Sequence, residues 1–393
     1  MENKIIQKNI PSGWQEANLG DITDLYQPET ISKNQMLSAG KYLVFGANGV
    51  IGKYNRFNHE DSEVIVTCRG ASCGSISMTP KQAWITGNAM VIKVNENKII
   101  KPYIYYFLKN SNLNTVISGG AQPQITRQPI SAYRILFPKS KTEQQKIAGI
   151  LGAVDEDIAK TQEVIEATEK LKRGLMQQLF TRGIGHTKFK ETKIGQIPEE
   201  WEVVKLSEIA QVERGKFSHR PRNAPEFYGG DIPFIQTGDV VNSNGKISLY
   251  TQTLNEKGLS VSKLFKKGTI VITIAANIGD TGILQFDSCF PDSLIGITSS
   301  EKIDSIFLEY YLRTQKEYLN SISTQSAQKN INLEKLNPLP IILPTKDEQK
   351  KIANILSAVD EKISVNKKLK AKLTTLKKGL MQDLLSGKVR VKN

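Results

Sequence analysis

The sequence predicts an α+β protein in which two mixed α/β domains are joined by two long antiparallel coiled-coil helices. Residues 143–179 recur as residues 348–384, at a constant offset of 205 positions with half of the residues identical. The motif Ile-Pro-x-x-Trp precedes each half, at 10–14 and again at 197–201. Short β-rich runs separated by turn-forming residues lie between the repeats. The chain is therefore an internal duplication, for which we expect pseudo-twofold symmetry.

Each repeated segment carries apolar residues at alternating steps of three and four, which is typical of paired helices. We expect these positions to form a helix or subunit interface: Ile147, Ile150, Val154, Val164, Leu171, Gly174, Leu175, Ile352, Ile355, Val359, Leu369, Leu376, Gly379 and Leu380. Thr142 and Asp347 stand directly before the repeats and are the expected helix caps.

Gly174 and Gly379 occupy equivalent positions inside the two expected helices. A glycine within a helix costs about 0.5–1 kcal/mol relative to alanine. Its presence in both copies predicts a close approach of backbone, either to the partner helix or to another subunit. Retention after duplication, without any such role, is the alternative.

The duplication also predicts the boundaries of the domains. The expected segments are a first globular domain at 1–142, a central coiled-coil helix at 143–182, a linker at 183–196, a second globular domain at 197–347, and a C-terminal coiled-coil helix with its tail at 348–393.

Both globular segments combine β-rich runs with one short helix near the end. The apolar runs at 41–46, 62–68, 88–94 and 268–275 predict strands, and those at 101–110 and 305–314 predict helices. The offset between equivalent positions grows from 187 at the entry motifs to 205 by Ala71. The second domain therefore holds about 18 additional residues, within roughly 213–268.

Length and composition favour a multidomain globular protein. The 393 residues are 39% hydrophobic and 23% charged. No run approaches the roughly 20 apolar residues of a membrane helix, and the N-terminus lacks a signal-peptide core. Three cysteines are too few for a disulfide framework, so we expect a cytoplasmic protein with these cysteines as small buried residues.

The formal net charge of +14 favours a polyanionic partner. The charge is uneven, however. Residues 1–142 hold 16 basic and 9 acidic groups, whereas residues 197–347 hold 16 basic and 18 acidic groups. Charge alone therefore does not identify the second domain as a nucleic-acid binder.

The repeated EQxKIAxILxAVDExI…LKxGLMQxL segments resemble the specificity subunit of a type I restriction–modification enzyme. The Ile-Pro-x-x-Trp entries and the segments GDIPFIQTGDV (230–240) and GAQPQI (120–125) add to this resemblance, which covers nearly the whole chain. It implies two target-recognition domains joined by the two helices, and a chain without catalysis of its own.

The resemblance further implies a bipartite DNA target, two bound adenine methyltransferase subunits, and restriction subunits that use ATP and Mg. S-adenosylmethionine would bind the methyltransferase, so no cofactor is expected on this chain. The duplication independently favours two identical partners on equivalent surfaces. Two dissimilar domains would recognise two different half-sites, and the helices would set the spacer between them.

Motifs for other chemistry are missing from the sequence. We find neither the phosphate-binding G-x-x-x-x-G-K-[ST] nor the [DN]-P-P-[FYW] segment of amino-methyltransferases. The three histidines lack metal-ligand spacing, so we expect no metal site and no catalytic residues. A coiled-coil assembly adaptor with incidental DNA binding is the main alternative. A fused methyltransferase or nuclease is disfavoured.

Basic and amide side chains are the groups that contact phosphates and base edges. The expected DNA-binding residues of the first domain are Lys53, Arg56, Arg69, Ser72, Lys81, Gln122, Gln124 and Arg127. Those of the second domain are Arg214, Lys216, Arg220, Arg222, Gln325, Gln328, Lys329 and Asn330. The alternative for many of them is ordinary exposed surface.

Overall fold

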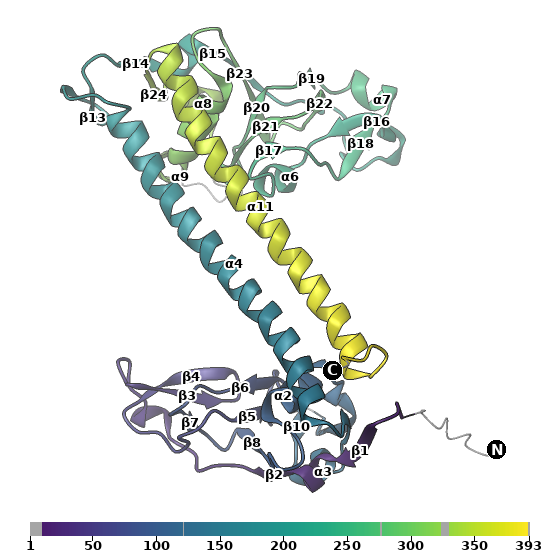
Figure 1. Cartoon of the computed structure of the whole chain (residues 1–393). Helices are drawn as coiled ribbons and strands as arrows, with labels where there is room; N and C mark the ends of the chain where they lie inside the picture. Colours follow the sequence, from purple (N-terminus) through teal and green to yellow (C-terminus); the bar gives the residue numbers. More distant parts are fainter. Residues whose placement is uncertain (1–9, 121, 276, 324–329, 392–393) are drawn as a thin grey trace. The chain divides into compact units, whose positions relative to one another are not determined.

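The computed structural model describes residues 10–391, except 121, 276 and 324–329. It confirms the predicted fold class, with two mixed α/β domains and two long helices (Figure 1). The chain divides into two compact units. Unit 1 comprises Met1–Val164 with Asn366–Asn393, and unit 2 comprises Ile165–Val365. Each unit thus holds one globular domain and one half of each long helix.

Unit 1 contains a four-stranded sheet in the order β2-β8-β5-β6 and a three-stranded sheet in the order β4-β3-β7. Its elements are β1 (Trp14–Asn18), α1 (Leu19–Ile22), β2 (Thr23–Tyr26), η1 (Lys33–Gln35), β3 (Tyr42–Gly46), β4 (Gly49–Tyr54), β5 (Val64–Thr67), β6 (Ile76–Met78), β7 (Trp84–Ile85), β8 (Ala89–Val94), α2 (Lys101–Asn110), η2 (Leu113–Val116), β9 (Ile117–Ser118), β10 (Gln124–Ile125), α3 (Arg127–Ser131), β11 (Arg134–Pro138) and α4 (Lys141–Arg182).

Unit 2 repeats this plan with one additional strand in each sheet. Its five-stranded sheet has the order β15-β23-β20-β21-β17, and its four-stranded sheet has the order β18-β16-β22-β19. Its elements are β12 (Phe189–Thr192), β13 (Gly195–Pro198), β14 (Glu202–Lys205), α5 (Leu206–Ile209), β15 (Ala210–Arg214), η3 (Pro225–Phe227), β16 (Tyr228–Phe234), α6 (Thr237–Val241), β17 (Gly245–Ile247), β18 (Gln252–Leu254), α7 (Glu256–Ser260), β19 (Leu264–Phe265), β20 (Ile270–Thr273), β21 (Thr281–Leu284), β22 (Ser288–Cys289), β23 (Leu294–Ser299), α8 (Ser305–Thr314), α9 (Lys316–Ile322), α10 (Leu333–Leu336), β24 (Pro340–Leu343) and α11 (Lys346–Leu385).

The additional residues of the second domain lie where the growing offset predicts them. The connection from β2 to β5 spans residues 27–63, whereas the equivalent connection from β15 to β20 spans residues 215–269. The second connection is 18 residues longer, because 55 residues replace 37. It contributes β17, α6 and α7, which have no counterpart in the first domain.

The expected helix caps are wrong by two residues in both copies. The hydroxyls of Ser140 and Thr345 accept hydrogen bonds from the backbone of Glu143 and Glu348, at 3.3 and 3.4 Å. These residues therefore occupy the N-cap position, three before each glutamate. The expected linker also proved to contain structure, because β12 and β13 form a hairpin within and just beyond 183–196.

In each unit, a buried glutamate near the start of one long helix binds residues from distant segments of that unit. We call it the closing glutamate. In unit 2, Glu348 accepts hydrogen bonds from Trp201 Nε1 at 2.9 Å and Ile184 N at 2.8 Å, and lies 3.0 Å from His186 Nε2. In unit 1, Glu143 instead binds Arg390 through Nε at 2.7 Å and Nη2 at 2.9 Å. In unit 2 the glutamate thus binds the tryptophan of the entry motif directly, whereas in unit 1 the arginine that binds the glutamate lies 5.7 Å from the Trp14 ring.

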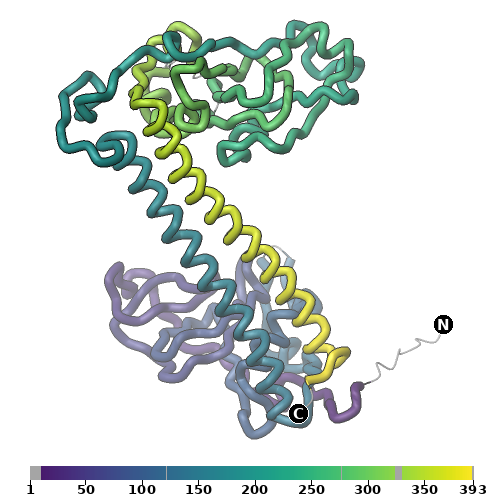
Figure 2. Tube along the Cα trace, turned by 45° about the horizontal axis from the view of Figure 1, so that its top comes forward, coloured from purple at the N-terminus to yellow at the C-terminus, as the bar shows by residue number. Residues whose placement is uncertain are grey.

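The two long helices run antiparallel within each unit (Figure 2). In unit 1, Lys377 Nζ of α11 binds Asp155 of α4, and Lys370 Nζ donates to Gln162 Oε1 at 2.7 Å. In unit 2, Lys172 Nζ donates to Asp360 Oδ1 at 2.6 Å. In each of these three pairs the two residue numbers add up to the same value, as antiparallel pairing of two helices requires.

Candidate nucleic-acid interface

Three loops of unit 1 bring several of the expected DNA-binding residues together. Arg69 and Gln124 pair across an isolated antiparallel bridge. Ser72 Oγ donates to Asn48 Oδ1 at 3.0 Å, which ties the same loop to the β3–β4 hairpin tip. Arg69 and Gln124 are exposed, and Ser72 is half-buried. The three loops therefore bring a guanidinium and amide side chains into one cluster.

The other candidates of unit 1 are dispersed. Lys53 lies on β4, while Arg56, Lys81 and Gln122 are exposed in loops. Arg127 is exposed at the start of α3, and its Nε donates to the carbonyl of Leu25. Exposed lysine and arginine side chains at such positions can reach phosphates without conveying sequence information.

The basic run of unit 2 is organised by an acidic residue that the sequence analysis missed. Arg222 Nη2 forms an ion pair with Asp292 Oδ1, and Arg220 Nη2 lies 3.5 Å from Asp292 Oδ2. Arg214 Nε donates to the backbone carbonyl of Asp292 at 2.7 Å. The four side chains are exposed or half-buried, so these pairs orient the arginines more than they stabilise the fold. Three cations around one carboxylate leave a local positive charge.

The remaining candidates of unit 2 are only partly placed. Gln325, Gln328 and Lys329 lie outside the described residues. Asn330 forms an isolated bridge with Ala275, in the place that Gln124 and Arg69 occupy in unit 1. Lys216 is exposed, and its carbonyl accepts a hydrogen bond from Ser262 Oγ at 2.7 Å.

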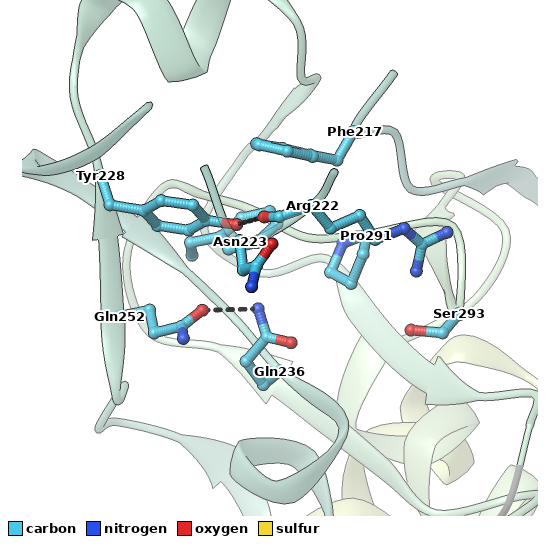
Figure 3. A pocket seen from close by; sticks show the side chains of 9 residues that line it. Phe217, Arg222, Asn223, Tyr228, Gln236, Gln252, Pro291 and Ser293 are labelled. Carbon is cyan, nitrogen blue, oxygen red and sulfur yellow. Dashed lines mark hydrogen bonds between the residues drawn. The ribbon is translucent and has the colours of Figure 1, made fainter. Parts of the chain in front are cut away.

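A polar pocket of about 310 Å³ lies beside the arginines in unit 2 (Figure 3). Its apolar wall is formed by Phe217, Tyr228, Phe234 and Pro291. The polar lining consists of Arg222, Asn223, Gln236, Gln252 and Ser293. Gln236 Nε2 donates to Gln252 Oε1 at 3.1 Å across the pocket floor.

The sequence contained only a partial signal for this pocket. Gln236 belongs to the quoted GDIPFIQTGDV segment, but Gln252 and Asn223 carried no distinguishing pattern. They meet because β16 and β18 pair with Phe234 opposite Gln252. Long-range strand pairing of this kind is not encoded in local spacing.

The positions expected at a helix or subunit interface divide by burial into two sets. Ile147 and Ile352 are buried, and Val154, Leu175, Val359 and Leu380 are half-buried. Ile147 packs in the core cluster of the first domain and Ile352 in that of the second. The apolar pattern near the helix starts therefore reflects packing onto the domains as well as helix pairing.

The other expected seam positions are exposed in the chain alone: Ile150, Val164, Leu171, Gly174, Ile355, Leu369, Leu376 and Gly379. Buried positions such as Leu151, Ile165 and Leu356 lie one residue further along. A Cβ atom at Gly174 or Gly379 would meet nothing within 4 Å, so neither glycine makes room for the partner helix. Their expected role toward another subunit stays a prediction.

The described residues contain no cluster of three or more histidine, cysteine, aspartate or glutamate side chains that could hold a metal. Burial raises the pKa of the Cys68 and Cys289 thiols, so both remain protonated near neutral pH. Along the part of the chain that the structure describes, no helix has the length and apolarity to cross a membrane.

Comparison with known proteins agrees with these observations. The family model for the type I restriction modification DNA specificity domain matches residues 11–169 and again 198–375. The MjaX type I restriction enzyme specificity subunit of Methanocaldococcus jannaschii is 34% identical, over 78% of this chain and 72% of its own length. The MjaVIII specificity subunit of the same organism is 29% identical, over 98% and 95%.

A solved structure shares the fold. The S subunit of a type I restriction–modification system from M. genitalium superimposes with a TM-score of 0.69 at 19% identity, covering 96% of this chain and 97% of that one. The double family match and the MjaX relative decide the assignment. The chain belongs to the family of type I restriction–modification DNA specificity subunits.

Proposed function

We propose that this chain selects a bipartite, asymmetric DNA sequence, with one globular domain recognising each half-site. The observation that carries the proposal is the contrast between duplicated and divergent parts. Glu143 and Glu348 are buried near the starts of the long helices in both units, and Asp155 and Asp360 each pair with a lysine of the opposite helix. The connections 27–63 and 215–269 differ in length and elements. Scaffold is preserved, while the candidate recognition loops are not.

We also propose that the duplicated helices dock two identical adenine methyltransferase subunits. Three pairs of exposed apolar residues stand at the offset of 205, namely Ile150 with Ile355, Val164 with Leu369, and Leu171 with Leu376. Exposed apolar residues repeated in this way favour a protein partner that occurs twice. Restriction subunits would join the same complex.

Catalysis belongs to those partners in this proposal. S-adenosylmethionine would bind the methyltransferase subunits, and ATP with Mg would bind the restriction subunits. The present chain would supply sequence choice and geometry, and its two helices would set the gap between the half-sites.

The test is modified-base mapping in a host that expresses this chain together with its methyltransferase, compared with the same host lacking only this chain. We expect methyladenine in one motif of two short halves around a fixed gap, present only with the chain. A genome methylation pattern indifferent to the chain would contradict the proposal and favour the assembly adaptor. DNA binding by the purified complex that does not weaken as the salt concentration rises would also favour the adaptor.

A further inference from the structure

We infer that the amide pair Gln236–Gln252 of the pocket recognises the base edge of an adenine in the half-site bound by the second domain. The inference rests on the proposed function and assigns a specificity role to two residues within it. It starts from the hydrogen-bonding capacity that the pair leaves open.

The pair presents one acceptor beside donors. Gln236 Nε2 donates to Gln252 Oε1 at 3.1 Å, which leaves a lone pair of the Gln236 oxygen and the Gln252 amino group for a ligand. Reversing both amides gives the same surplus, so the argument is independent of how their oxygen and nitrogen atoms are assigned. Adenine alone presents a neighbouring acceptor and donor, N7 and N6, in the major groove. Guanine presents two acceptors there, and cytosine presents a donor.

The fold fixes the backbone that carries both amides. Gln236 N donates to Asp239 Oδ2 at 2.8 Å, and Thr251 Oγ1 donates to the same carboxylate at 3.3 Å. Gln252 opens β18 opposite Phe234 of β16. Gln236 is half-buried and Gln252 is exposed, so the pair is held at its base and open to a ligand. Such preorganisation reduces the ordering cost of recognition.

The surroundings match a DNA backbone next to the base. Arg214, Arg220 and Arg222 gather around Asp292 at the pocket's edge, and Arg222 lines the pocket itself. The Tyr228 hydroxyl donates to the Arg222 carbonyl, which anchors this basic loop to the aromatic wall. Phosphate contacts from the arginines would position the duplex, while the amides would distinguish the base.

The first domain carries different chemistry at the same place. There, Val50 of β4 stands opposite Phe45 of β3, as Gln252 stands opposite Phe234. Val50 is 51% exposed and offers only an apolar contact. The residue opposite the phenylalanine is therefore polar in one domain and apolar in the other, although the surrounding scaffold is retained. Two specificity elements for different half-sites are expected to differ in this way.

The experiment maps methyladenine motifs in cells that express the methyltransferase with wild-type chain, Gln236→Ala, Gln252→Ala or Gln252→Glu. Gln196→Ala is the matched control, because Gln196 is an exposed glutamine with a side-chain hydrogen bond, to Glu191 at 3.3 Å, outside the pocket. The thermal midpoint of each purified variant checks its folding.

We expect both alanine variants to relax one adenine position of one half-site about tenfold or more, with the other half and the gap unchanged. Gln252→Glu keeps the size but removes the donors, and it should shift that position toward cytosine, whose N4 donates to carboxylates. Folded variants with the wild-type motif would overturn the inference, and so would an equal loss across the whole motif. Failure of the proposed function is a separate result, because wild type itself would then produce no chain-dependent motif.

Discussion

At the scale of single residues, unit 2 contains a buried ion pair that its duplicate lacks. Glu309 of α8 is 2% exposed and accepts from Arg313 Nη2 at 2.7 Å and Thr281 Oγ1 at 2.9 Å. Arg313 also lies 5.0 Å from the Tyr310 ring. The equivalent of Arg313 in α2 is Lys109, which is exposed. The two domains therefore share a helix but not its electrostatics.

Arg313→Ala should destabilise the chain by about 3–5 kcal/mol, because the Glu309 carboxylate stays buried without its counter-ion. Lys109→Ala, the matched change in the duplicate, should cost less than about 0.5 kcal/mol. Denaturant unfolding of both purified variants measures the difference. Equal effects at the two positions would show that burial of Glu309 is not what makes Arg313 important.

His59 in unit 1 predicts a pH dependence of stability. Burial, with a smaller effect of Lys93, lowers the pKa of His59 below its ordinary value of 6.5. The ring lies 2.9 Å from the Tyr26 hydroxyl. Because the unfolded chain gains this proton first as the pH falls, the stability contributed by His59 is complete above pH 6.5. It is lost as the pH falls through the lower pKa of the folded state.

We therefore expect wild type to lose more stability than His59→Gln when the pH is lowered from 7.5 to 5. Thermal midpoints at several pH values test this expectation. His219→Gln is the control, since His219 is also half-buried but lies in a loop of the other unit. A steeper pH dependence in His59→Gln than in wild type would reverse the sign and refute the argument.

At the scale of elements, the glycines that follow the long helices differ in role from the glycines inside them. Gly183 follows α4 with φ +63, and a Cβ atom there would lie 2.6 Å from Glu348 Oε1 and from the Trp201 ring. Gly387 follows α11 in the same way, with φ +71 and Pro11 nearby. A left-handed glycine after a helix is a common terminator. Here it also lets the chain turn toward the glutamate that closes the unit.

Gly183→Ala should destabilise the chain by at least about 1–2 kcal/mol, from left-handed backbone strain together with the clash. Gly174→Ala lies in the same helix in open space, and it should stabilise the chain by about 0.5–1 kcal/mol. Denaturant unfolding compares the two. A Gly174→Ala variant that is less stable than wild type would contradict the open surroundings of this residue.

The same Gly174→Ala variant, with Gly379→Ala, also tests the prediction of a close subunit contact. If a partner subunit approaches these glycines, both variants should keep or gain stability alone but lose methylation in the assembled complex. Full methylation by both variants would favour simple retention after duplication.

At the scale of the whole molecule, the helices are the proposed spacer. Inserting one heptad after Val164 in α4 and one after Val365 in α11 preserves the antiparallel pairing and lies where the two units divide. Seven residues add about 10 Å of helix at 1.5 Å per residue. The target gap should lengthen by up to about three base pairs of 3.4 Å, with both half-sites unchanged.

Methyladenine mapping with the lengthened chain measures the new gap. A seven-residue insertion after Lys193, in the turn between β12 and β13, is the control, because it lengthens the chain without lengthening either helix. That control should keep the wild-type gap. An unchanged gap in the double-heptad chain, with methylation retained, would contradict the role of the helices as spacer.

Local sequence patterns predicted several elements closely. The apolar runs 101–110 and 305–314 form α2 and α8 with the expected bounds. Pro102 near the start of α2, and the Asp304 side chain accepting from Ile306 N and Phe307 N in α8, explain why these helices begin where they do. The dipeptide Asn48-Gly49, a common hairpin-turn sequence, lies where β3 turns into β4. In each of these cases the determining interactions are only a few residues apart.

Long-range features escaped prediction for the converse reason. Asp292 joins arginines some seventy residues earlier, and Gln252 reaches Gln236 only through the pairing of β16 with β18. The expected interface positions do not share one environment, because Ile147 and Ile352 pack against the globular domains rather than only against a helix. Periodicity reports that a face is buried but not which surface covers it.

The sequence by itself determined the duplication, the two α/β domains, the long helices and the family, because repeats and helical periodicity are written along the chain. Only the tertiary structure decided where the recognition chemistry lies. The closing glutamates, the arginines around Asp292 and the Gln236–Gln252 pair each depend on contacts between distant segments. Those contacts follow from strand pairing and burial, which spacing in the sequence does not specify.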